Sequence, residues 1–165
     1  MGEQETAFIA VYDAHADALF RFAYFSVRDR ELAKDLVADT FTKVWQYIAG
    51  GNIVGNIRAF CYRTLRNLIV DHWRKHKSLS LDDLAEGGFE PSGEDGHDTV
   101  MKNEELRVVK KAIAGLPLAI REVVMLRYIE GYDPKEIAEL LGISQSLVSV
   151  RIFRGTALLK KHIRI

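Results

Sequence analysis

The 165-residue sequence contains a single cysteine, Cys61, and only three prolines. One cysteine cannot form an intramolecular disulfide, and no CxxC pair or nearby histidine accompanies it at metal spacing. We therefore expect neither a secreted disulfide framework nor a zinc site, and we place Cys61 in the core, with a redox sensor as the alternative. Nearly half of the residues are apolar and few prolines interrupt them, a composition that suits compact helical bundles.

Long apolar runs are also missing. No stretch approaches the roughly 18 residues that a membrane span needs. The first residues, MGEQETAF, are acidic, whereas a signal peptide begins with basic residues. We expect a cytoplasmic protein without membrane insertion.

The familiar catalytic fingerprints are absent as well. The sequence has no P-loop, HExxH or GxSxG motif and no strand followed by a glycine fingerprint. Asp82 and Asp83 form a carboxylate pair in a stretch with no scaffold to fix their geometry, and the five histidines are scattered. We expect no enzymatic activity, no cofactor and no metal.

The net charge is zero, but the charges are segregated along the chain. Residues 1–51 contain eight acids and five bases, and residues 52–77 contain one acid and six bases. Residues 79–98 contain seven acids and no lysine or arginine, whereas residues 145–165 contain five bases and no acid. Two basic segments therefore flank an acidic connector.

Three amphipathic helices are predicted before the connector, because apolar residues recur three and four positions apart. They span residues 5–26, about 30–48 and 56–77, and the glycine-rich sequence AGGNIVGN turns the chain before the third. The third helix is basic. One face is apolar, and the other presents Arg58, Tyr62, Arg63, Arg66, Asn67 and Arg74. These residues suit phosphate neutralisation and base contacts, although a solvated basic face explains the composition equally well.

Residues 78–99 are rich in glycine and acids and poor in large apolar residues, which is typical of a flexible linker. A linker of about 22 residues reaches at most roughly 75 Å, close to two turns of duplex DNA at about 34–36 Å each. Two units joined in this way could contact sites two turns apart.

Four further helices are predicted after the linker. The first spans residues 100–114 with Leu106, Val109 and Ile113 inward, and the second begins near Pro117 and ends before Gly131. Asp133 is expected to cap a short helix over 134–141, and Ser144 a last helix to about residue 162. A short helix, a turn with glycine and a longer basic helix describe a helix-turn-helix. The predicted fold is all-α, with helical domains over residues 1–77 and 100–165.

Three long segments resemble a known family: YDAHADALFRFAYFSVRDRELAKDLVADTFTKVWQYI, IRAFCYRTLRNLIVDHWRK and LPLAIREVVMLRYIEGYDPKEIAELLGIS. Their content, order and spacing are similar to those of the extracytoplasmic function (ECF, group IV) sigma factors of the bacterial sigma-70 family. The resemblance implies a region 2-like helical bundle, a region 4-like helix-turn-helix and a role in directing RNA polymerase to promoters. It also implies three partners, which are core RNA polymerase, promoter DNA and an anti-sigma factor.

By this resemblance, the helix over residues 31–48 pairs with the clamp helices of the polymerase beta-prime subunit. The candidates on its exposed side are Asp35, Asp39, Thr42, Lys43 and Gln46, although a solvated face would look the same.

The resemblance also places the promoter −10 element on residues 51–77, where one strand is opened and a base enters a pocket near residues 52–57. The candidate contacts are Asn52, Asn56, Arg58, Tyr62, Arg63, Arg66, Asn67 and Arg74. Phe60 and Trp73 could stack on bases, but their helical core spacing favours packing.

The last helix would bind the −35 element in the major groove. Its candidate contacts are Ser144, Gln145, Ser146, Ser149, Arg151 and Arg154. This helix has fewer cations than is usual in the family, which predicts a salt dependence shallower by about 0.9 in log slope per lost contact. Val150 and Phe153 could instead meet thymine methyl groups or a protein partner.

Other interpretations remain open at this stage. The acidic linker could mimic nucleic acid near the polymerase cleft or act as a plain tether. The whole chain could be an ordinary helix-turn-helix regulator, or a decoy that binds core polymerase or an anti-sigma factor without binding promoters. The basic helix argues against the regulator, in which it would have no task.

Overall fold

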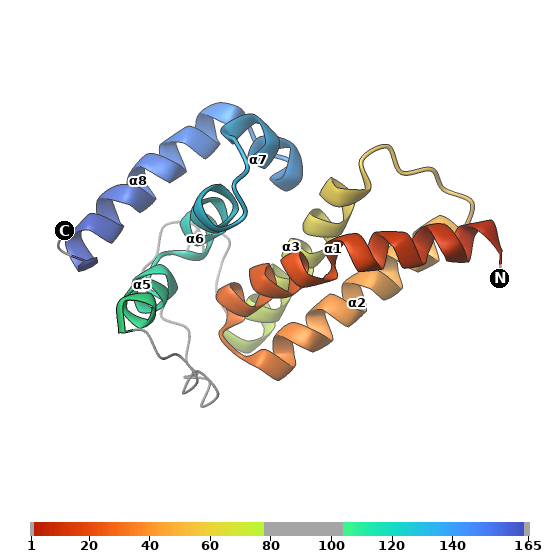
Figure 1. Cartoon of the computed structure of the whole chain (residues 1–165), viewed down its shortest axis with the longest axis horizontal. Coiled ribbons are helices and arrows are strands. Elements are labelled where there is room, and N and C mark those ends of the chain that lie inside the picture. The colour runs from red at the N-terminus through yellow and green to blue at the C-terminus, as the bar shows by residue number, and fades with distance from the viewer. Residues whose placement is uncertain (1, 78–103, 164–165) are drawn as a thin grey trace.

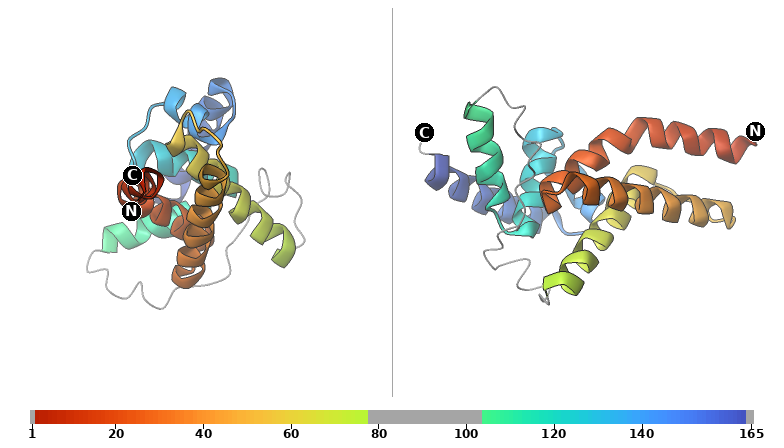
Figure 2. Two further views of the ribbon diagram at one scale, coloured as in Figure 1. Left: turned by 90° about the vertical axis from the view of Figure 1, so that its right-hand side faces the viewer. Right: turned by 90° about the horizontal axis from the view of Figure 1, so that it is seen from below.

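The computed structural model describes residues 2–77 and 104–163, and every regular element in these ranges is a helix. The predicted linker lies outside the described residues. In the N-terminal half, α1 (Glu3–Val27) and α2 (Arg30–Ala49) lie side by side, and α3 (Ile57–Lys77) crosses them (Figures 1 and 2). None of the helices that the structure describes combines the length and the apolar character needed to cross a lipid bilayer.

The turn between α1 and α2 is set by local hydrogen bonds. Arg28 adopts a left-handed conformation with φ 55°, and its backbone N–H donates to the carbonyl of Tyr24, which ends α1. Asp29 then caps α2, because its carboxylate accepts a hydrogen bond of 3.1 Å from the backbone of Leu32. The two helices therefore pack against each other directly.

The core of this half lies where the three helices meet. Leu19, Val44, Leu65 and Ile69 have no exposed surface, and Phe22 is 1% exposed. Cys61 belongs to the same core, and burial raises the pKa of its thiol to about 11. The prediction that Cys61 is a core residue is confirmed.

Over residues 104–163, the C-terminal half consists of four α-helices and one π-helical segment: α5 (Glu104–Ala114), α6 (Leu118–Val124), η2 (Met125–Ile129), α7 (Pro134–Leu141) and α8 (Gln145–Ile163). The π-helical segment continues α6 without a break. Because α5 packs mainly through its last turn, the prediction that Val109 faces inward is wrong, and its side chain is 38% exposed.

The helix-turn-helix is confirmed as α7 and α8, with the predicted caps. Asp133 and Glu136 exchange hydrogen bonds of 2.8 and 2.9 Å in a capping box. Gly142 ends α7 at φ +69°, a conformation that favours glycine. Ser144 caps α8 by accepting a 3.1 Å hydrogen bond from the backbone of Leu147.

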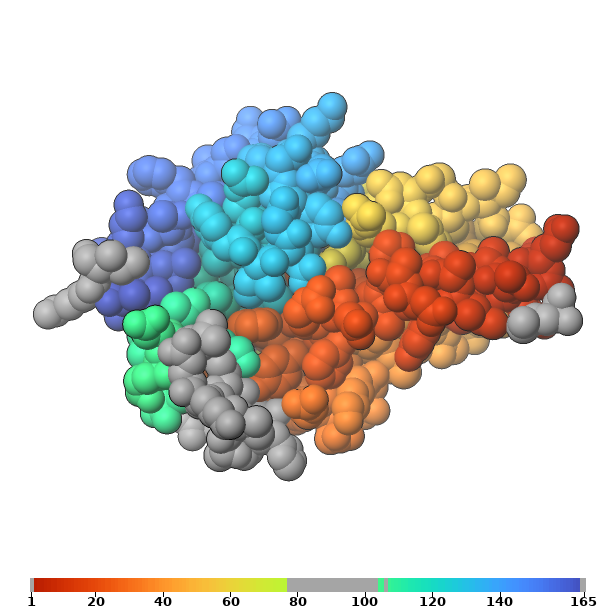
Figure 3. All heavy atoms as spheres, in the orientation of Figure 1, coloured from red at the N-terminus to blue at the C-terminus, as the bar shows by residue number. Residues whose placement is uncertain are grey.

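The two halves are in contact. Helices α6 and α7 lie against α1 and α3, and the space-filling view shows their atoms meeting along the face in view (Figures 1 and 3). Buried residues of both halves, including Leu65 and Ile137, form one continuous apolar cluster. Separate domains were predicted, but their packing against each other was not.

Candidate nucleic-acid interface

The basic face of α3 is exposed along only part of its length. Arg58, Arg63, Asn67 and Arg74 are exposed, whereas Arg66 is half-buried. Tyr62, expected on the same face, is 1% exposed because its ring packs edge-on against Phe22 in the interior. Burial also raises the pKa of the Tyr62 phenol. Helical spacing alone could not separate Tyr62 from its exposed neighbours.

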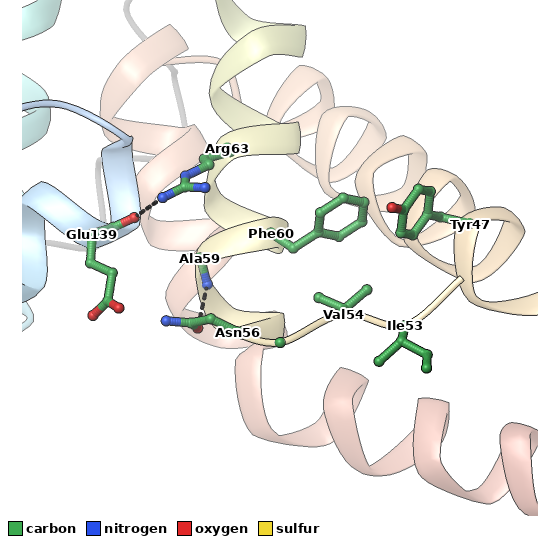
Figure 4. A pocket seen from close by; sticks show the side chains of 9 residues that line it. Tyr47, Ile53, Val54, Asn56, Ala59, Phe60, Arg63 and Glu139 are labelled. Atoms are coloured by element: carbon green, nitrogen blue, oxygen red, sulfur yellow. Dashed lines mark hydrogen bonds between the residues drawn. The ribbon is translucent and has the colours of Figure 1, made fainter. Parts of the chain in front are cut away.

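A pocket of about 380 Å³ opens where the loop after α2 meets the start of α3 (Figure 4). Its lining residues are Tyr47, Ile53, Val54, Gly55, Asn56, Ala59, Phe60, Arg63 and Glu139. The rings of Tyr47 and Phe60 face each other with centroids 4.8 Å apart. This concave surface of aromatic, apolar and amide groups lies where the sequence predicted a base pocket.

The two asparagines of the loop fix its ends. The Asn52 amide donates a 2.9 Å hydrogen bond to the carbonyl of Tyr47, at the end of α2. The Asn56 side chain accepts a 3.0 Å hydrogen bond from the backbone of Ala59 and so caps α3. Between them, Ile53 is 93% exposed. The loop therefore presents an apolar side chain to solvent while both of its ends are anchored.

The C-terminal half covers part of this face. The Arg63 guanidinium donates a hydrogen bond to the backbone carbonyl of Glu139 in α7 (Figure 4). Arg58 lies over the ring of Tyr132, with its guanidinium carbon 5.5 Å from the ring centroid. These contacts occupy arginines that the sequence assigned to DNA.

Arg66 makes the deepest of these contacts. Its Nε donates a 3.0 Å hydrogen bond to Oε2 of Glu122, whose side chain is completely buried. Burial raises the pKa of the Glu122 carboxyl, and the charges of Arg66, Arg151 and Arg121 oppose that shift. Asn67 and Arg74 make none of the contacts with the C-terminal half described here, and both remain exposed.

On α8, most of the predicted −35 contacts point to solvent. Gln145, Ser146, Ser149 and Arg154 are exposed, and Ser144 is exposed while it caps the helix. Arg151 differs, because it is partly buried and its Nη1 is enclosed with no hydrogen-bond partner among the described residues. Burial lowers the pKa of Arg151, and the nearby Glu122 opposes this. Val150 and Phe153 are 44% and 76% exposed, so an apolar surface interrupts this basic helix.

The face of α2 assigned to core polymerase is open. Its five residues Asp35, Asp39, Thr42, Lys43 and Gln46 are all exposed. They lie opposite the buried side of α2, which is formed by Leu36, Phe41 and Val44. The exposure agrees with a docking surface without identifying the partner.

Sequence reasoning missed four residues that join the halves, namely Arg121, Glu122, Glu130 and Tyr132. Arg121 has no exposed surface and donates to the carbonyls of Phe25 and Ser26 at 3.1 and 3.0 Å. It also donates to the carbonyls of Ala114 and Leu116, at 2.9 and 2.7 Å. The sequence held a signal, since a charged pair inside the apolar run LPLAIREVVML must be buried with partners.

Comparisons with known proteins agree with this architecture. Residues 11–79 match the family "Sigma-70 region 2", and residues 106–159 match "Sigma-70, region 4". The ECF RNA polymerase sigma factor SigW of Bacillus subtilis is 28% identical over 172 residues, covering 99% of this chain and 91% of SigW. SigX of the same organism is 25% identical over 168 residues, covering 98% of this chain and 86% of SigX. SigL of Mycobacterium tuberculosis is 28% identical over 144 residues, covering 87% of this chain and 81% of SigL.

A solved structure has the same fold. It contains the sigma factor RpoE in complex with the anti-sigma factor NepR from Bartonella quintana, and it aligns with a TM-score of 0.75 at 23% identity. The alignment covers 96% of this chain and 98% of the RpoE chain. The two sigma-70 regions, in their usual order and on this fold, show that the chain belongs to the sigma-70 family as an ECF RNA polymerase sigma factor.

Proposed function

We propose that this ECF sigma factor binds core RNA polymerase through the exposed face of α2 and reads promoters with two separate surfaces. Residues 1–77 bind core polymerase and the −10 element, residues 100–165 bind the −35 element, and residues 78–99 connect them. The protein assists initiation by binding and opening DNA, and it catalyses no reaction itself. The five exposed residues of α2 are the proposed contacts with the beta-prime clamp helices.

The observation that best supports promoter opening is the pocket between α2 and α3. Flipping a base out of the duplex costs a few kcal/mol, which stacking and hydrogen bonds in a pocket can offset. The facing rings of Tyr47 and Phe60 supply an aromatic wall, and Asn56 supplies an amide at the rim. A plain cationic surface would bind phosphates without stabilising an extruded base.

Run-off transcription with purified core polymerase on a library of genomic promoters tests this function. The expected result is initiation at a specific subset of promoters, and Asn67→Ala or Arg63→Ala should reduce promoter opening more than core binding. Binding to core without initiation at any promoter would favour the decoy. Equal loss of opening and core binding in these variants would contradict the assignment of α3.

We further propose that an anti-sigma factor regulates the protein. The related RpoE fold was solved in complex with one, and the likeness extends over both halves of this chain. Co-purification with a chromosomally encoded partner that blocks core binding is the expected result. The proposal would be contradicted if none of the co-purified proteins competed with core polymerase for this protein.

A further inference from the structure

Arg151 lies on the side of α8 that packs against α6. It follows Val148 by three positions and precedes Gly155 by four, so the three residues share one side of the helix. Val148 has no exposed surface. Gly155 is also buried, and a Cβ atom there would lie 2.5 Å from Cγ2 of Val124 in α6. The side chain of Arg151 therefore leaves α8 on its interior side rather than on its solvent-facing side.

A buried acid of α6 acts on this arginine. Burial lowers the pKa of Arg151, and the carboxylate of Glu122 is the charge that opposes this shift. Glu122 has no exposed surface, and its Oε2 atom accepts the hydrogen bond from Arg66. Its Oε1 atom and Nη1 of Arg151 are both enclosed, and neither has a hydrogen-bond partner within residues 2–77 and 104–163. One of these atoms is an acceptor and the other a donor, so each supplies what the other lacks.

Arg154, the other arginine assigned to the −35 element, has different surroundings. It is exposed, and so is Phe153 beside it. A phosphate or a base edge can approach Arg154 without displacing protein groups. Nη1 of Arg151 is enclosed and would first have to leave the interior. The sequence placed both arginines in one group, and their surroundings separate them.

We propose that Arg151 is a positioning residue for promoter recognition and does not bind DNA directly. This inference rests on the proposed function of α8. The carboxylate of Glu122 holds Arg151 and thereby fixes the orientation of α8 on α6. A buried charge that loses its partner is costly, so α8 resists any rotation that would separate Glu122 from Arg151. Direct DNA contacts are left to the exposed residues of α8, Arg154 among them.

Salt dependence separates a positioning arginine from a phosphate contact. The probe is a short duplex with the −35 region of a promoter that the protein transcribes with core polymerase. The full chain can be used, because Arg154 and its neighbours are exposed in it. Arg154→Gln should make the slope of log affinity against log salt shallower by about 0.9, the value for one lost phosphate contact. Arg151→Gln should keep the slope of the parent protein and lower the affinity about five- to tenfold, roughly the worth of one base contact.

A scrambled duplex distinguishes positioning from a general loss of stability. An unfolded fraction of the protein would lower the affinity for the −35 duplex and for the scrambled duplex by the same factor. Arg151→Gln should instead lose affinity for the −35 duplex alone, because binding to a scrambled duplex depends on phosphate contacts. An equal loss on both duplexes would contradict a positioning role.

The two partners can also be compared directly. Glu122→Gln preserves the shape and removes the charge, and it should lower the affinity for the −35 duplex about as much as Arg151→Gln. The double variant E122Q/R151Q should lose no more than about twofold beyond either single variant, because both changes remove the same interaction. An effect that acted through Arg66 would add to that of Arg151→Gln instead. Glu104→Gln removes an acid at an exposed position of α5 and is the matched control, which should bind like the parent protein.

A measurement on the parent protein does not depend on how well the variants fold. In nitrogen-15 spectra, the Nε–H signal of Arg154 should shift when the −35 duplex is added, whereas that of Arg151 should keep its position. An Arg151 signal that shifts like that of Arg154 would overturn the inference. A slope for Arg151→Gln as shallow as that for Arg154→Gln, or parent-like binding by both Arg151→Gln and Glu122→Gln, would do the same. A parent protein that initiates at no promoter would instead refute the proposed function and the inference with it, a result distinct from a changed slope in a protein that binds.

Discussion

Gly155 is the point where α8 approaches α6 most closely, and replacing it with alanine should destabilise the protein. A Cβ atom at this position would lie 2.5 Å from Cγ2 of Val124 and 2.9 Å from Cγ2 of Ile120. Both neighbours are buried and β-branched, so their side chains have few alternative rotamers. The helices must therefore move apart or a side chain must adopt a strained conformation.

The expected size follows from two opposing effects. Overpacking a core costs about 1–3 kcal/mol, and this contact belongs at the upper end because two branched side chains are involved. Alanine in a helix is favoured over glycine by about 1 kcal/mol. The net loss should be about 1–2 kcal/mol of unfolding free energy, or about 2–8 °C in Tm for a protein of this size.

Urea denaturation followed by circular dichroism measures this loss. Gly115→Ala is the matched control, because its Cβ would lie 3.6 Å from the nearest atom, an ordinary contact. The double variant G155A/V124A should be more stable than the sum of the single changes predicts, by about 0.5 kcal/mol or more, because it removes the clashing methyl group. A Gly155→Ala protein as stable as the parent would refute the reasoning on close approach.

Three other outcomes follow from the described contacts. Asn56→Ala should cost about 0.5–2 kcal/mol of stability, measured by denaturation, because α3 loses its cap at Ala59; an unchanged midpoint would contradict that role. Burial is the main cause that lowers the pKa of His15 and His72 below 6.5, so the folded state binds fewer protons than the unfolded state. Unfolding free energy should therefore fall as pH drops below about 6.5, and glutamine at both positions should flatten this slope between pH 5 and 7. Finally, Cys61 should react with a thiol reagent only as fast as the protein unfolds, and rapid native-state modification would restore the redox-sensor interpretation.

The helices and their ends could be predicted because the signals that set them are local. Asp133 lies three residues from Glu136 in the capping box, and Ser144 lies three residues from the backbone group that it caps. The apolar spacing that predicts a buried face extends over a few turns of one helix. Such features do not depend on how distant parts of the chain meet.

The packing of the two halves could not be read in the same way. Arg66 and Glu122 are 56 positions apart, and Arg21 and Glu130 are 109 apart. From the sequence alone, Arg66 and Arg21 each fit a solvated or DNA-binding face. Only the tertiary structure shows that each arginine is paired with a glutamate of the other half. Tyr62 is an example. Its position on the helix predicted an exposed side chain, but residues that pack against it from other helices bury it.

The contact between the two halves also bears on the order of events in the proposed function. The α2 face is exposed while the halves are in contact, so the proposed core-polymerase contacts Asp35, Asp39 and Gln46 are accessible without any rearrangement. The α3 face is different, because Arg63 and Arg66 would have to leave Glu139 and Glu122 before they could make the proposed DNA contacts. In the proposed function, docking on core therefore precedes promoter binding, because the α2 face is already exposed whereas the α3 face must first be released.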